Sequence, residues 1–161
     1  MAEPHLVLNA MTADDARAAL TRCCGSRRWV DAMLARRPWP SVGALHADAE
    51  STWAGLDRDD YLQAFAGHPR IGAGGTDTWS RQEQAAAADA AGETQRALRA
   101  ANDRYVDRFG YIFIVCATGK SAAEMLRLLE ARLDNDPDRE LAIAAGEQAR
   151  ITRLRLEKLG A

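Results

Sequence analysis

Cysteine is scarce in this sequence: there are three among 161 residues, and Cys23 and Cys24 are adjacent. Such a set does not make a disulfide framework or a metal site with spaced ligands, so we expect reduced, core-forming cysteines and no metal. Long apolar runs are absent too, since none approaches the roughly 20 residues that span a bilayer. The N-terminus has no signal-peptide pattern, and the chain does not end in a peroxisomal address. We therefore expect a cytoplasmic protein with no membrane partner.

An excess of one charge is also missing. The chain has 21 Lys and Arg residues against 23 Asp and Glu residues, a formal net charge of −2. Because acidic residues are interleaved with the arginines, no basic patch emerges, which argues against nucleic acid as a partner. Internal repeats, low-complexity segments and linkers are not found either. The length is that of one domain, residues 1–161, with a core that needs no disulfide.

The chain is rich in helix-start signals. At several places a capping residue precedes an apolar run with helical spacing. These capping residues are Thr12, Ser26, Ser41, Asp57, Ser121 and Asp136. Gly110 is suited to end a long helix that starts at Arg81, in which Gly92 allows a bend or a break. The sequence thus predicts an all-α fold, a compact single-domain bundle of about seven or eight helices.

One segment does not fit this pattern. Residues Tyr111 to Ala117 are the most apolar stretch of the chain and are rich in β-branched side chains. Propensity alone predicts a buried strand there, but no second strand of similar quality exists to pair with it. We therefore expect one buried extended connector. Its backbone N–H and C=O groups then need other partners, and a ligand could be one of them.

Two of the three histidines carry no functional signal. His5 precedes any predicted structure, and His46 is expected in mid-helix as a surface or hydrogen-bonded residue. His68 differs, because the following Pro69 holds it in an extended backbone at a breakpoint after Gly67. Taken alone, a histidine before proline is more often only a turn residue.

A second polar cluster follows a glycine-rich loop. Ser80 and Glu83 form a capping box at a helix start, and Gln84 comes next. Capping alone explains the first two residues. If the loop folds back, however, a histidine, a carboxylate and a carboxamide would meet at the positive end of a helix. That arrangement suits acid–base chemistry on a small polar anion.

The last predicted helix carries an arginine on its inward face. Gln148, Ile151, Arg155 and Leu159 follow one another at helical spacing, so Arg155 is flanked by apolar residues. A guanidinium there either extends to solvent, pairs with an acid or clamps an anionic ligand.

Together these segments resemble the family of 2-oxo-4-hydroxy-4-carboxy-5-ureidoimidazoline (OHCU) decarboxylases. The resemblance extends from about Leu8 to Leu159, and the order and spacing of its motifs make it specific. Its motifs are His68-Pro69, the helix start at Ser80 to Gln84, residues 109–117, Lys120-Ser121, residues 133–136 and residues 151–156. The loop of residues 73–79 looks shorter than in many members.

The resemblance implies a homodimeric, cofactor-independent all-α enzyme that converts OHCU to (S)-allantoin in urate degradation. It assigns the catalytic roles to His68 and Glu83. The substrate-binding residues that it implies are Pro69, Ser80, Gln84, Phe113, Ile114, Val115, Cys116, Ala117 and Arg155. Arg153 competes with Arg155 for the role of the C-terminal arginine.

Two other classes of function remain open from the residues alone. The chain could be a helical interaction module whose four tryptophans form a partner surface; these are Trp29, Trp39, Trp53 and Trp79. It could also be a hydrolase or lyase that acts on another ureide with the same His68 and Glu83 pair.

Overall fold

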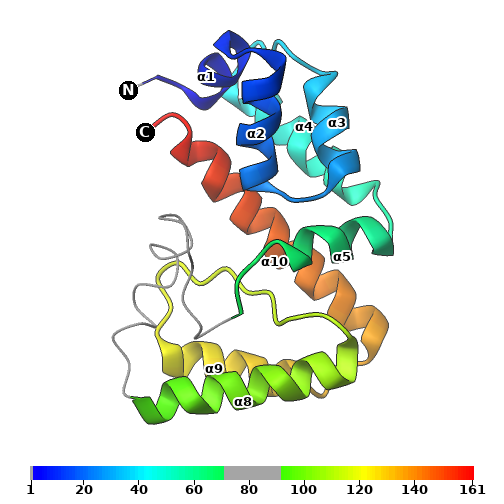
Figure 1. Ribbon diagram of the computed structural model, residues 1–161, viewed down its shortest axis with the longest axis vertical. Helices are drawn as coiled ribbons and strands as arrows, with labels where there is room; N and C mark the ends of the chain where they lie inside the picture. The colour runs from blue at the N-terminus through cyan, green and yellow to red at the C-terminus, as the bar shows by residue number, and fades with distance from the viewer. Residues whose placement is uncertain (1, 71–91) are drawn as a thin grey trace. The chain divides into compact units, whose positions relative to one another are not determined.

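The computed structural model describes residues 2–70 and 92–161 (Figure 1). These residues form eight helices, and no strand is found among them. The helices are α1 (Pro4–Ala10), α2 (Ala13–Cys23), α3 (Arg27–Leu34), α4 (Val42–Ala54), α5 (Arg58–Ala66), α8 (Gly92–Phe109), α9 (Ala122–Arg132) and α10 (Pro137–Lys158). The predicted all-α fold is confirmed. In the same two ranges, no helix has both the length and the apolar character that crossing a membrane requires.

The described chain divides into two compact units. The first comprises Met1–Gly67 and Gln148–Ala161, and the second comprises His68–Glu147. Helix α10 therefore begins in the second unit and ends in the first. The assignment of residues 1–161 to a single domain stays a prediction.

The predicted helix starts are confirmed by their caps. Thr12 Oγ1 accepts a hydrogen bond from the Asp15 N–H at 3.1 Å, and the other predicted caps act in the same way. Asp57 and Asp60 close a reciprocal capping box, because each side chain accepts the other's backbone N–H. The remaining capping bonds are those of Ser26, Ser41, Ser121 and Asp136. Each cap satisfies an N–H that the first helical turn leaves without an intrahelical partner.

Three of the four tryptophans lie in the core of the first unit. Trp29, Trp39 and Trp53 are all buried. The Trp29 indole N–H donates to the Ala49 carbonyl at 3.1 Å, so its polar atom is satisfied inside the unit. Trp79 lies outside the described residues. The predicted tryptophan surface for a partner is therefore wrong for three of its four members, which are core residues.

Two histidine predictions are wrong. His5 does not precede all structure, because it lies in α1 and is only 5% exposed. Pro4 at the first helical position was the available signal for α1. His46 in α4 is 6% exposed and is therefore not a surface residue. Its Nδ1 has no hydrogen-bond partner in the described parts of the chain, so it is not a fully satisfied core histidine either.

The extended connector of the second unit is present as predicted. Helix α8 ends at Phe109, and the φ of 86° at the following Gly110 lies in the left-handed region, where a side chain would be strained. Residues 112–117 then run without helix or strand, and Phe113, Ile114 and Cys116 are buried. A turn at Gly119, with φ of 78°, leads to α9. The aromatic rings of Tyr105 and Phe113 pack edge to face, with centroids 5.4 Å apart.

Candidate active site

His68 lies where the sequence predicts a breakpoint. Helix α5 ends at Ala66, and His68 and Pro69 follow as half-buried, non-helical residues. The next residue, Arg70, pairs with Asp103 of α8 at 2.8 Å. Because both side chains of this pair are exposed, it orients the turn but contributes little to stability. The imidazole of His68 is thus presented from a turn next to a helix of the second unit.

The second polar cluster cannot be placed. Ser80, Glu83 and Gln84 lie outside the described residues, as does the loop of residues 73–79. Their capping, catalytic and binding roles therefore stay predictions.

Side chains from three helices hold the backbone of the extended connector. The Phe113 N–H donates to Asn102 Oδ1 of α8 at 3.0 Å, and the Ile114 carbonyl accepts from an Arg132 Nη of α9 at 2.8 Å. The Cys116 N–H donates to Glu147 Oε1 of α10 at 3.2 Å. These bonds replace the ladder that a partner strand would supply.

Ile112 and Val115 are the two residues of this segment whose backbone groups bond no described residue, and Val115 lies between bonded neighbours. The backbone groups of Val115 make no hydrogen bond with any residue that the structure describes. Val115 is also less buried than Ile114 and Cys116, which flank it.

Arg132 belongs to a buried ionic cluster that sequence reasoning missed. Its guanidinium donates to Glu140 Oε2 through two nitrogens, at 2.9 and 2.6 Å, and Glu140 is fully buried. The Tyr105 hydroxyl and the Asn135 amide also bond this carboxylate. Burial, followed by the bond to Glu140, raises the pKa of Tyr105, so its hydroxyl remains a donor. Nothing in the spacing of these residues marks them, because they come from three helices and a loop.

The two candidate arginines of α10 have different surroundings. Arg155 is 9% exposed and donates to the Arg22 carbonyl at 2.9 Å, inside the first unit. It also acts electrostatically on Cys24, although burial is the larger influence and raises the pKa of that thiol to about 12. The prediction that Arg155 lies on an inward face is confirmed.

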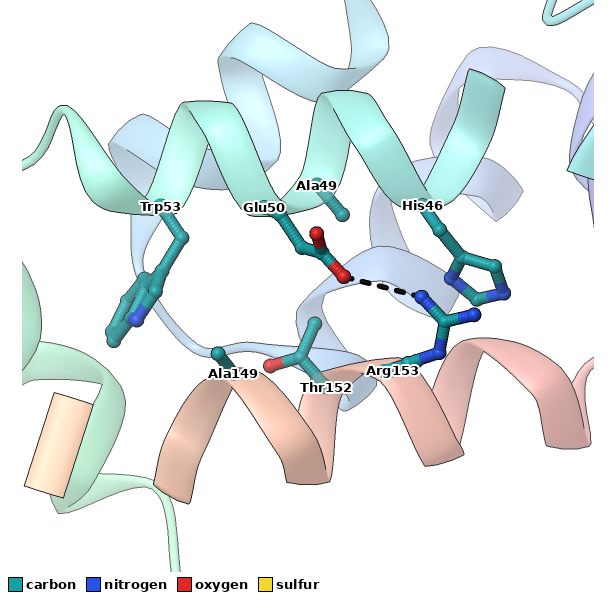
Figure 2. Close-up of a pocket in the computed structure, with 7 residues that line it drawn as sticks. All are labelled: His46, Ala49, Glu50, Trp53, Ala149, Thr152 and Arg153. Carbon is teal, nitrogen blue, oxygen red and sulfur yellow. Dashed lines mark hydrogen bonds and ion pairs between the residues drawn. The ribbon is translucent and has the colours of Figure 1, made fainter. Parts of the chain in front are cut away.

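Arg153 is a surface residue. Its side chain is 50% exposed, and it pairs with Glu50 at 3.1 Å and with Glu157 at 3.5 Å. Figure 2 shows the pair with Glu50 across a pocket between α4 and α10. The pocket is lined by His46, Ala49, Glu50, Trp53, Ala149, Thr152 and Arg153. Two carboxylates neutralise Arg153 there, which makes it the weaker candidate for an anion clamp.

Comparison with known proteins identifies the family. A model of the family described as OHCU decarboxylase matches residues 9–157, which is most of the chain. The chain belongs to the OHCU decarboxylase family. A decarboxylase of this name from Halalkalicoccus jeotgali is 30% identical over 129 residues, covering 76% of this chain and 72% of that protein.

Two further similarities concern a longer relative and a solved structure. The uric acid degradation bifunctional protein TTL of Arabidopsis thaliana is 37% identical over 146 residues, which cover 85% of this chain. This chain matches less than half of the length of TTL, namely 45%. A crystal structure of an OHCU decarboxylase in the presence of (S)-allantoin is also 37% identical. It superposes with a TM-score of 0.77, covering 86% of this chain and 94% of that one.

Proposed function

We propose that this protein is a cofactor-independent carboxy-lyase that decarboxylates OHCU to (S)-allantoin in urate degradation. The observation that carries the proposal is the family match over residues 9–157. The similarity to an OHCU decarboxylase crystallised in the presence of (S)-allantoin supports it, because 94% of that chain is covered. The substrate class, the reaction and the residue roles below belong to this proposal.

The substrate supplies its own electron sink. In OHCU, the ring carbon that loses CO₂ carries a hydroxyl group and is bonded to an imine carbon. When the bond to CO₂ breaks, its electron pair moves into the neighbouring imine, whose nitrogen takes up a proton. The hydroxyl then loses its proton, and a proton is added to the carbon that bears the ureido group. The protein therefore needs to supply proton transfer and placement rather than an electron-accepting cofactor.

His68 is the proposed general acid–base residue. The unperturbed pKa of imidazole lies near neutrality, so the side chain can both accept and donate a proton at physiological pH. The half-buried turn after α5 presents it next to Pro69, which we assign to the substrate-binding wall. Glu83 is proposed to act with His68, while Ser80 and Gln84 bind ring and ureido N–H groups.

The extended connector is the proposed wall for the carboxylate and the ureido group. Its buried residues Phe113, Ile114, Cys116 and Ala117 are apolar, and a dry surface favours neutral CO₂ over a carboxylate. The N–H and C=O of Val115, which bond no described residue, are available to a ureide. Arg155 is the proposed clamp for a carboxylate or ureido oxygen.

The stereochemistry of the product tests this function. OHCU is generated by oxidation of urate, and its decay is followed by ultraviolet absorbance and circular dichroism. Spontaneous decay gives racemic allantoin, so a decarboxylase of this family should speed the decay and give an excess of the (S) enantiomer. An unchanged decay rate and a racemic product would favour the interaction-module alternative, which the buried tryptophans already weaken. A hydrolase or lyase for another ureide would also leave the spontaneous decay of OHCU and its racemic product unchanged, but it would consume its own ureide substrate.

A homodimer in the cytoplasm is also part of the proposal. The resemblance supports the dimer. The net charge of −2 supports a protein without a nucleic-acid or membrane partner, as is usual in the cytoplasm. Sedimentation of the purified protein measures the oligomeric state directly.

Arg155 and Arg153 provide a matched pair of variants. Arg155→Lys should raise the Michaelis constant for OHCU at least about tenfold, because an ammonium lacks the planar fork that binds an oxyanion through two bonds. Arg153→Lys should leave the Michaelis constant unchanged and alter stability by less than about 1 kcal/mol, as expected for an exposed pair. Steady-state rates and thermal melts of both variants measure these effects. Near-native constants for Arg155→Lys would remove it from the site, and a defect confined to Arg153→Lys would transfer the role to Arg153.

A further inference from the structure

The extended connector has no strand beside it among the described residues, so its shape must be set by other contacts. Four of its backbone groups are bonded to side chains. The Cys116 carbonyl accepts from Lys120 Nζ, in the turn before α9, at 2.8 Å, and the other three groups bond one side chain each from α8, α9 and α10. These side chains are those of Asn102, Arg132 and Glu147. The bonds fall on Phe113, Ile114 and Cys116, which lie on both sides of Val115. Val115 itself bonds to none of the described residues.

Arg132 is oriented so that one edge nitrogen of its guanidinium bonds the connector. Two of its nitrogens are engaged by Glu140, and the third donates to the Ile114 carbonyl at 2.8 Å. The guanidinium also lies over the Phe113 ring, 4.4 Å from its centroid. Because Glu140 is in turn bonded by Tyr105 and Asn135, a network of buried hydrogen bonds fixes the direction of the guanidinium.

We propose that Arg132 and Glu147 are positioning residues for the reaction, since they hold the backbone on either side of Val115 in the conformation that receives the ureide. This inference rests on the proposed function. Neither side chain needs to touch the substrate. Arg132 fixes the Ile114 carbonyl, Glu147 fixes the Cys116 N–H, and the N–H and C=O of Val115 are thereby held in place for the ligand. A displacement of about 1 Å at such a surface can cost about 100-fold in rate.

Glu147 allows a test without disrupting the buried cluster, because it is only partly buried. Glu147→Gln keeps an oxygen that can accept the Cys116 N–H, whereas Glu147→Leu removes it. We expect Glu147→Gln to keep kcat/KM within about threefold of the wild type and Glu147→Leu to lose at least about tenfold. Glu147→Leu should also lower the enantiomeric excess of (S)-allantoin.

Arg132→Lys provides the second variant. A lysine can keep its charge next to Glu140, but a single ammonium cannot also reproduce the fork that reaches the Ile114 carbonyl. We expect the same signature, a tenfold or larger loss of kcat/KM with a lower enantiomeric excess, at a melting temperature that still shows a folded protein. If Arg132→Lys does not fold, the two Glu147 variants decide the question by themselves.

The control is Asp136→Ala, which removes the N-cap of α10 in the same unit. The cap bonds the Arg139 N–H and is not among the side chains that hold the connector. Its loss should lower the melting temperature by several degrees without changing the enantiomeric excess. Enzyme concentrations are adjusted so that each variant converts OHCU at the wild-type flux. Spontaneous racemic decay then contributes equally to every product sample.

The outcomes separate this inference from the function on which it rests. A wild-type protein that neither speeds the decay nor gives (S)-allantoin overturns both. An active wild type, with Glu147→Leu and Arg132→Lys at near-native kcat/KM and full enantiomeric excess, overturns the positioning role alone. Equal loss of enantiomeric excess in Asp136→Ala and Glu147→Leu would also overturn it, because general destabilisation would then explain the effect.

Discussion

His68→Asn is expected to abolish the acceleration of OHCU decarboxylation while the protein stays folded. An amide side chain does not ionise near neutral pH and so cannot act as a general acid or base, and such assistance is typically worth about 10²–10⁴ in rate. His68 lies in a half-buried turn after α5 and outside the fully buried core, so its replacement should leave the melting temperature near the native value. Single-turnover and steady-state rates, measured beside thermal melts, test both halves of this expectation.

A matched histidine variant sharpens the result. His46→Asn changes the same residue type in the first unit, where His46 is buried in α4. It should affect stability more than kcat/KM. Retention by His68→Asn of more than about a tenth of the wild-type kcat/KM, a loss of about 1.4 kcal/mol or less, would refute the acid–base assignment.

The second large effect is expected for Glu83→Gln. If the charge of Glu83 acts on the substrate or on His68, the amide should lower kcat/KM at least about 100-fold while stability changes little. If Glu83 serves only as the reciprocal cap for Ser80, a glutamine also closes the capping box, and both losses should be small. Steady-state rates and thermal melts of the same preparations distinguish the two roles.

Ser80→Ala is the control for capping. Removal of a serine cap costs about 1 kcal/mol of stability, and this variant should show that loss. It should also weaken substrate binding if Ser80 contacts the ureide. If Glu83→Gln loses only a little activity and a little stability, Glu83 has a purely structural role.

The helix starts could be predicted because their determinants are local. A cap such as Thr12 or Asp57 bonds an N–H only three residues away, so the sequence contains both partners side by side. Gly110 was predictable for a similar reason, because its positive φ is a property of one residue. Helix α1 escaped prediction, since seven residues are too few to show a helical period and only Pro4 indicated a start.

The candidate site was predictable only in part. The sequence indicated that His68 sits at a helix end and that Arg155 faces inward, and both placements are confirmed. The sequence could not show that Arg153 is paired at the surface while Arg155 is buried. One partner of Arg153, Glu50, is 103 residues away in the chain, so no local pattern reveals the pair. The roles of Ser80, Glu83 and Gln84 still rest on the resemblance.

The sequence by itself determined that residues 111–117 form a largely buried extended segment, because they are apolar, rich in β-branched side chains and without a partner strand. Only the tertiary structure decided what holds them. Asn102 and Glu147 lie 11 and 31 residues from the backbone groups that they bond. Arg132 reaches the Ile114 carbonyl from 18 residues away, and its direction depends on Glu140. Such bonds depend on how three helices pack around one segment, and no local spacing encodes that packing.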